Sequence, residues 1–218
     1  KKVFGEIDII VAIPNMPIYM DGGFLQNTGD PTQVVWAYLV ATRDSSNHGR
    51  WYAVKSSGYT NITPGVGANP SAYLANYTES INITTSWVGN VFFINDGINA
   101  PMYYSATQSE IYFYDAAPNY YVWNYEATST PAVNSVVAGF MRNYCSPNVG
   151  NILIAGNLTK TYASGQVINY PTTVRWSQAF ANTGVPASWT PTLSNVANEV
   201  EIPVRGPIID GFFLGGNF

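Results

Sequence analysis

Residues 89–97 read GNVFFINDG, and the opening of this stretch returns twice further along the chain. GNILIAGNL occupies residues 150–158, and GGNF at 215–218 places the same Gly-Asn-apolar start at Gly216. The three starts are separated by 61 and 66 residues. Glycine and asparagine tolerate positive φ, so each start is typical of a turn that leads into a short apolar strand.

Each of the first two copies is followed by a strand that begins at proline, PMYYS at 101–105 and PTTVRWS at 171–177. The unit is thus a strand, an Asn-rich turn and a Pro-led aromatic strand, with GRWYAV from Gly49 as a fainter echo. Units of four short strands need roughly 40–50 residues, or somewhat more with long loops, which favours β-propeller blades over a two-layer sandwich. The alternative is that these are ordinary turns without a shared ancestry.

Short segments rich in Val, Ile and aromatic residues, bounded by Gly, Asn, Asp or Pro, predict an all-β protein. Besides those above they are QVVWAYLVAT at 33–42, RWYAVKSSGY at 50–59, EIYFYDA at 110–116 and YYVWNYEA at 120–127. The best helical alternative, TPAVNSVVAGFMRN at 130–143, has Pro131 at a plausible first turn, but we favour a strand there. We expect an N-terminal β region at 1–86 and a repeated β-blade region at 87–218 that continues beyond residue 218. The chain would then be a segment of a larger propeller-containing protein.

Composition narrows the class of function. Charged residues make up 10% of the chain, against roughly 25% in ordinary globular proteins. So few charges indicate either a protein that buries much of its surface in an assembly or an extracellular β domain with an Asn-, Thr-, Ser- and Tyr-rich surface. The net charge of −4 and the scatter of the nine Lys and Arg residues argue against nucleic-acid binding as the main task, since phosphates are bound by clustered cations.

The usual carriers of catalytic and metal chemistry are missing. Cys145 is the only cysteine, which excludes a disulfide within the chain, and His48 is the only histidine. With no GxSxG or HExxH spacing either, neither a Ser-His-Asp set nor a zinc site is expected. We expect His48 to be an exposed turn residue. The apolar run at 7–13 is short and reads as a strand, so no membrane-spanning segment is predicted. We therefore predict no enzymatic activity, no cofactor and no metal site.

A pair of carboxylates is the one catalytic arrangement that the composition leaves open, because a glycosidase needs only an acid and a base or nucleophile. Most acids of a β protein are solvated. Asp96 within INDGIN fits a turn between adjacent strands better than a catalytic role. A propeller glycosidase is therefore a minor alternative, and its candidate acids are Asp21, Asp96, Glu110, Asp115 and Asp210.

A cluster of aromatic residues occupies positions 110–127, which read EIYFYDAAPNYYVWNYEA. Core packing within the chain, contact with another subunit and a carbohydrate-stacking surface are all open interpretations, since each favours Tyr and Trp. Alternation along a strand would place three of these aromatics on one face. The candidate interface residues are Tyr112, Tyr114, Tyr121, Trp123 and Tyr125.

Two tryptophans stand thirteen positions apart in TTVRWSQAFANTGVPASWTPTLSNVANE, residues 172–199, which carries almost no charge before Glu199. They belong either to a stacking platform or to a repeated architecture. Residues 174–202, with NILIAGNLT and INYPTTV before them and GPIIDGFFLGGNF after them, resemble the tail nozzle protein of short-tailed bacteriophages, also called tail tubular protein B. FFINDGINAPMYY at 92–104 is similar to an earlier element of that family, and the resemblance covers residues 87–218.

The resemblance implies a structural virion protein with a β-propeller fold. It would be a subunit of a ring, sixfold in the family, below the portal and adaptor, through which genomic DNA is ejected. Its partners would be copies of itself, the tail adaptor and the tail fibres or spikes, with DNA only as passing cargo and no stable nucleic-acid binding. Its location would be the virion tail, after assembly in the bacterial host cytoplasm. An acidic balance suits a channel that must not retain DNA.

The family pattern also implies a structural motif within this segment. We expect Trp176 to anchor a strand in the core and the turn at 186–189 to pin against it. A carbohydrate-binding β module of a receptor-binding or secreted protein is the alternative from another class, and the Tyr-rich region 112–125 would carry it. The motif residues are Arg175, Trp176, Ser177, Pro186, Ser188 and Trp189.

Overall fold

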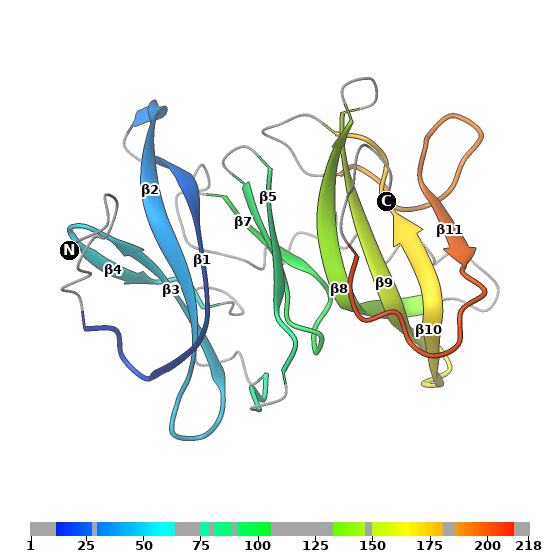
Figure 1. Ribbon diagram of the computed structural model, residues 1–218, viewed down its shortest axis with the longest axis horizontal. Helices are drawn as coiled ribbons and strands as arrows, with labels where there is room; N and C mark the ends of the chain where they lie inside the picture. The colour runs from blue at the N-terminus through cyan, green and yellow to red at the C-terminus, as the bar shows by residue number, and fades with distance from the viewer. Residues whose placement is uncertain are drawn as a thin grey trace.

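Figure 1 shows the computed structural model, which describes residues 12–27, 30–63, 75–78, 81–88, 91–105, 133–146, 150–180 and 186–211. The strands in these ranges form three antiparallel sheets, and the described residues include no helix. The first sheet contains β1 (Met16–Asn27), β2 (Asp30–Arg43), β3 (Gly49–Lys55) and β4 (Gly58–Asn61). The middle sheet contains β5 (Thr84–Val88), β6 (Val91–Asn95) and β7 (Met102–Ser105). The third sheet contains β8 (Val133–Ser146), β9 (Gly150–Tyr162), β10 (Val167–Trp176) and β11 (Asn198–Glu201).

The prediction of an all-β protein is confirmed. Within each sheet, strands that follow one another in the chain are hydrogen-bonded neighbours, in the orders β1-β2-β3-β4, β5-β6-β7 and β8-β9-β10-β11. The segment at 130–143, for which a helix was the alternative, contributes to β8. Buried Val136 and Ala138 lie two positions apart and pack in the same core cluster, as the period of a strand requires.

The repeated stretches fall at equivalent places in two sheets. The apolar parts of GNVFFINDG and GNILIAGNL form β6 and β9, each the second strand of its sheet along the chain. The Pro-led stretches contribute to β7 and β10, each the third strand. GRWYAV instead forms β3, the third strand of the first sheet, so it is not an equivalent copy. Residue 86, at which we divided the chain, lies inside β5.

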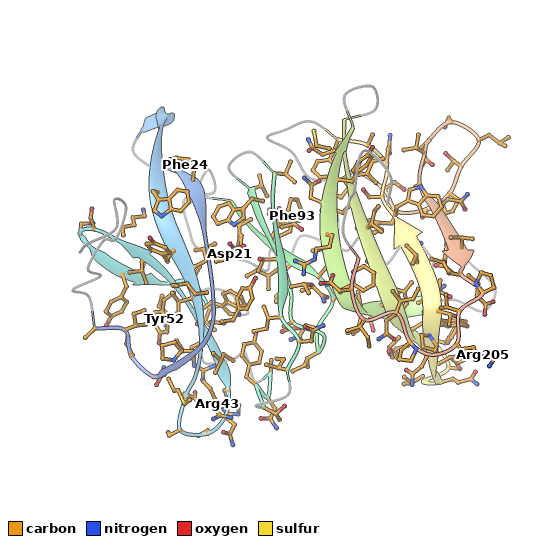
Figure 2. All side chains as sticks on the ribbon, viewed as in Figure 1. Asp21, Phe24, Arg43, Tyr52, Phe93 and Arg205 are labelled. Atoms are coloured by element: carbon orange, nitrogen blue, oxygen red, sulfur yellow. The ribbon has the colours of Figure 1, made fainter. Side chains whose placement is uncertain are left out.

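The middle sheet lies between the other two and is covered on both faces, as the arrangement in Figure 1 shows. On one face Phe92 packs against Trp51 of the first sheet, with ring centroids 6.3 Å apart. On the other face Phe93 belongs to a cluster with Leu153 and Trp189, and Figure 2 shows it between the middle and third sheets. All five residues of β6 are buried, which explains why the strand reads as a continuous apolar run rather than an alternating one.

The junction of the first and middle sheets contains one close packing contact and one partly buried carboxylate. Gly23 on β1 lets the indole of Trp87 lie against the strand backbone, since a Cβ there would sit 2.5 Å from the ring. Asp21, labelled in Figure 2, accepts hydrogen bonds through Oδ2 from the Thr85 hydroxyl at 2.5 Å and from the Trp87 indole N–H at 3.1 Å. Side chains of β5 therefore fix the distance between the two sheets.

The junction of the middle and third sheets uses backbone groups. β8 is an edge strand of its sheet, and its outward backbone groups are met by polar side chains. The Met141 N–H donates to the Thr84 hydroxyl, and the Asn143 N–H donates to the Ser86 hydroxyl, both at 2.9 Å. An edge covered in this way is protected from pairing with a foreign strand.

Candidate functional site

Trp189 and Arg175, two of the motif residues, form one buried unit. Trp189 is 0% exposed and packs in the cluster shared by the middle and third sheets. Arg175 on β10 is 1% exposed, and its Nε and Nη2 donate to the carbonyl oxygen of Trp189 at 3.4 and 3.1 Å. The arginine thus fixes the turn that carries the tryptophan, and this part of the segment serves the architecture.

Trp176 is placed differently from our expectation that it would anchor the strand in the core. It follows the buried Arg175, so alternation puts its side chain on the opposite face of β10, where it is half-buried. Its indole N–H donates to the carbonyl oxygen of Val196 at 2.6 Å. The inward position of the strand is taken by Arg175 because its guanidinium finds acceptors there, while Trp176 ties down the loop that precedes β11.

The remaining motif residues hold backbone in the same region. Ser177 is buried, and its hydroxyl accepts from the backbone N–H of Leu153 at 3.0 Å. Pro186 is buried, and the Ser188 hydroxyl accepts from the backbone N–H of Thr190 at 3.0 Å. The structure therefore brings the six motif residues together around β10 and the loop at 186–197.

Sequence reasoning missed a cluster of three charged side chains beside this motif, of which the two cationic ones are buried. Glu199 accepts from Arg175 Nη1 at 3.3 Å and from Lys160 Nζ at 2.9 and 3.1 Å. Lys160 also lies 5.0 Å from the centroid of the Tyr170 ring. Burial lowers the pKa of Arg175, and the charge of Glu199 opposes that shift. The cluster joins β9, β10 and β11, and no local sequence spacing reveals it because Lys160 and Glu199 are far apart in the chain.

Asp96, one of the glycosidase candidates, closes a turn. It is 1% exposed, and its Oδ1 accepts the backbone N–H groups of Ile98 and Asn99 at 2.9 and 2.8 Å. Its Oδ2 accepts from the Tyr77 hydroxyl at 3.2 Å, and that hydroxyl accepts from the Trp51 indole at 2.8 Å. The turn interpretation of INDGIN is confirmed, and the carboxylate also anchors the core of the first junction.

The other candidate acids are engaged elsewhere or lie outside the described residues. Asp21 belongs to the first junction, and Asp210 forms an ion pair with Arg142 at 2.7 Å. Glu110 and Asp115 fall in 106–132, outside the described residues. The same range contains the proposed interface aromatics Tyr112, Tyr114, Tyr121, Trp123 and Tyr125, so those predictions are untested.

A pocket of about 400 Å³ lies where the turns of the middle sheet meet β8 and β9. Asn157 enters it from a position with φ of 55°, opposite an irregularity in the register of β10. Asparagine amides and isoleucine side chains make up most of the pocket wall. The carboxylate in the wall is that of Asp96, which already accepts a backbone N–H in the turn after β6. The lining includes Asn82, Asp96, Ile98, Gly139, Asn157 and Ile209.

The described residues give no support to metal chemistry at the histidine. His48 is partly exposed, in a turn where its Nδ1 lies 3.8 Å from Asp44. No group of three or more His, Cys, Asp or Glu side chains in the described ranges is arranged to hold a metal ion. No helix in the part of the chain that the structure describes has the length and apolar character needed to cross a membrane.

The first sheet presents aromatic side chains on the face turned away from the middle sheet. On β2 the core residue Ala37 stands between Trp36 and Tyr38, which point to that opposite face. The rings of Phe24 and Trp36 lie 5.1 Å apart at 82°, and those of Trp36 and Tyr38 lie 6.1 Å apart at 85°. Phe24 is 53% exposed and Trp36 44%. We call this surface the aromatic face; it consists of Met20, Phe24, Trp36, Tyr38 and Tyr59.

A second set of exposed apolar side chains belongs to the opposite end of the stack. It comes from the third sheet and the segments attached to it, and Leu193 in the loop before β11 is the most exposed member at 111%. Apart from Ile98 and Ile209, which line the same pocket beside the middle sheet, every large hydrophobic residue that is exposed in the described ranges lies in this set or in the first sheet. We call it the third-sheet set: Val167, Leu193, Val196, Val200 and Val204.

The aromatic face had a signal in the sequence that we did not use. The stretch WAYLVA at 36–41 carries apolar residues at both its odd and its even positions, which is typical of a strand covered on both faces. The odd positions fill the core shared with the middle sheet, whereas the even positions run from the exposed Trp36 to Val40, which is buried in a smaller cluster on the other face. No protein family and no curated protein matches the sequence.

Proposed function

We propose that the protein is a structural, ring-forming subunit of a bacteriophage tail nozzle. The observation that carries the proposal is the placement of exposed apolar side chains at the two ends of a three-sheet stack. Exposed apolar patches of this kind mark contact surfaces in soluble proteins. The sparse charge of the chain, 10% of its residues, agrees with a surface that is largely covered in an assembly.

Exposed apolar side chains of different kinds at the two ends favour contacts between unlike surfaces. Such head-to-tail contacts close into a ring when the rotation between neighbours allows it. The aromatic face of one copy would then meet the third-sheet set of the next, in the sixfold arrangement that the resemblance implies. Adaptor and fibres or spikes would bind to the rims of this ring in the virion tail.

The proposal includes a propeller-type arrangement of the sheets. Three up-and-down sheets packed face to face in chain order are what successive propeller blades present, and the repeated stretches occupy equivalent strands in two of them. The motif residues Arg175 and Trp189, which carry the resemblance, are buried where one such blade packs against its neighbour. DNA would pass the ring as cargo, and a net charge of −4 favours passage over retention.

The geometry of the aromatic face supports protein packing over sugar stacking. A carbohydrate platform needs exposed rings that lie roughly parallel to the sugar ring. Phe24 and Tyr38 each stand nearly perpendicular to Trp36, which is the edge-to-face packing of a protein interface. The Tyr-rich region 112–125 belongs to the carbohydrate alternative, and a glycan array is its test.

The test of the proposed function is the mass of the native assembly, measured by mass photometry and by particle symmetry in electron microscopy. We expect a closed ring with a central channel. The Phe24→Arg variant places a charge on the aromatic face and should dissociate the ring. Ile98→Arg is the matched control, because Ile98 is also exposed, at 42%, but lies at neither end. A wild-type monomer that binds glycans would overturn the proposal.

A further inference from the structure

The segment 202–211 returns from β11 along the third sheet, as Figure 1 shows at the red end of the chain. Its Ile202 and Ile208 N–H groups donate to the carbonyl oxygens of Thr172 and Pro171 on β10, both at 2.9 Å. Its far end reaches Arg142 on β8, two strands away. The segment therefore crosses the sheet, and we call it the strap.

The far end of the strap is fastened by one two-pronged ion pair. Arg142 Nε donates to Asp210 Oδ1 at 3.0 Å, and Nη2 donates to Oδ2 at 2.7 Å. Parallel bonds of this kind are the strong form of an arginine–carboxylate pair. The third nitrogen, Nη1, donates to the Thr85 carbonyl of the middle sheet at 3.3 Å. Arg142 thus connects the strap to two sheets at once.

The body of the strap has little else to hold it among the described residues. Residues 203–207 are all exposed, with Val204 at 48%, and Ile209 remains 64% exposed. Few buried contacts and few backbone hydrogen bonds are the features of a segment that opens locally at low cost. Ile209 also lines the pocket beside Asn157, so release of the strap removes one wall of that pocket.

The surface beneath the strap is preformed. Because the side chain of Arg142 binds Asp210, the end of the strap lies on the face of β8 that carries this side chain. Alternation and register put Phe140 and Val174 on the same face, and both are buried. An identical segment from a second copy would meet the same acceptors, the same arginine and the same apolar residues.

We propose that the strap detaches as a unit when the Arg142–Asp210 pair opens, and that its place on the third sheet is a docking site for the strap of a second copy. Exchange of an identical element between protomers needs no new interface chemistry, because every contact already exists within one chain. The exchange part of this inference rests on the proposed function as an assembling subunit, whereas the detachment part does not.

Arg205 gives a direct readout of detachment, because it lies exposed in the strap and is a trypsin site. Cleavage of a folded protein follows the population of the open form when closing is fast. Asp210→Asn should accelerate cleavage at Arg205 up to about fivefold, because the pair is partly exposed, with the thermal midpoint of the sheets nearly unchanged. Asp44→Asn, which breaks the Asp44–Arg50 pair at the far end of the molecule, is the matched control and should leave the rate unchanged. Equal cleavage rates in wild type and Asp210→Asn would overturn detachment.

Exchange is tested by two charge-reversal variants, R142D and D210R. Each variant alone places like charges at the latch and should be cleaved quickly at Arg205. In a mixture, the arginine of one variant can pair only with the strap of the other, so slow cleavage and a mixed species in native mass spectrometry are expected. Fast cleavage that persists in the mixture, with no mixed species, would overturn exchange. The ring test stands apart, since a ring can form from the two apolar ends with every strap in place on its own chain.

Discussion

Two successive threonines on β5 attach the middle sheet to its two neighbours in different ways. The Thr85 hydroxyl serves the first sheet: it donates to the Asp21 carboxylate at 2.5 Å and lies 2.6 Å from the Tyr19 hydroxyl. The Thr84 hydroxyl serves the third sheet, where it accepts the backbone N–H of Met141 at 2.9 Å. The same residue type therefore makes a bond to a carboxylate on one side and to a peptide group on the other.

The difference shows what each junction has to achieve. At the junction of the first and middle sheets the partly buried carboxylate of Asp21 must be satisfied, because removing an unpaired charge from water is costly. At the junction of the middle and third sheets the unpaired edge of β8 must be satisfied, because buried backbone donors without partners are costly too. Successive hydroxyl side chains on β5 point to opposite faces of the strand and so meet both needs. The three sheets are therefore held together by hydrogen bonds as well as by apolar burial.

The largest expected loss of stability comes from a substitution at the junction of the middle and third sheets. Trp189→Ala should lower the free energy of unfolding by about 3–5 kcal/mol, because a fully buried indole leaves a cavity in the shared cluster. Urea denaturation followed by tryptophan fluorescence and circular dichroism measures the change. The matched control is Trp176→Ala in the same motif, a half-buried residue, with an expected loss of about 1–2 kcal/mol. Equal losses would mean that burial does not separate the two tryptophans.

The next effect compares the two junctions directly. Thr85→Val should cost about 2–3 kcal/mol, since it removes the hydroxyl donor to the Asp21 carboxylate and leaves the Tyr19 hydroxyl with one partner fewer. Thr84→Val, the matched change on the neighbouring residue, should cost about 1–2 kcal/mol. Native-state hydrogen exchange adds a local readout, because only the Thr84 variant should speed exchange at the Met141 N–H. A larger loss from Thr84→Val than from Thr85→Val would reverse our ranking of the junctions.

Much of the fold followed from local sequence because its signals are local. Runs such as VFFIN and WAYLVA have strand composition, and the turn at Asp96 has turn chemistry, so strands and hairpins were predictable. The stacking order of the sheets was not, because it depends on contacts between residues such as Trp51 and Phe92 that are distant in the chain. The boundary at residue 86 fell inside β5 because no composition change marks a division there.

The candidate site was less predictable, for a physical reason. The motif around residues 175–189 was visible, but its sequence does not say that Arg175 rather than Trp176 points inward. That choice depends on Glu199 and on the carbonyl oxygen of Trp189, which supply acceptors only once the loop has folded back. The Arg142–Asp210 pair spans 68 residues and has no sequence signature.

The smallest expected effect is a change of stability with pH that depends on Asp210 in the third-sheet region and not on Asp44 in the first sheet. The hydrogen bond and charge of Arg142 hold the pKa of Asp210 below its ordinary value. A carboxylate whose pKa is lowered in the folded state stabilises it at pH above the ordinary value of about 3.9, and this contribution is lost as the pH falls through the folded pKa. Arg142 on β8 faces Asp210, and Tyr19 and Asp21 on β1 face Arg142.

Because the pair is partly exposed, its contribution should be below about 1 kcal/mol at neutral pH. The stability difference between wild type and Asp210→Asn should therefore be present at pH 7 and absent at pH 2, in urea titrations at both values. The pKa of Asp44, at the other end, is also lowered: burial raises it, but the N–H donors of His48 and Ser46 and the charge of Arg50 outweigh that. Hydrogen exchange distinguishes the two carboxylates. On acidification the backbone N–H groups of the strap should lose protection because Asp210 is protonated, and protonation of Asp44 should not affect them. A strap that loses protection equally in wild type and Asp210→Asn on acidification would show that another group fastens it.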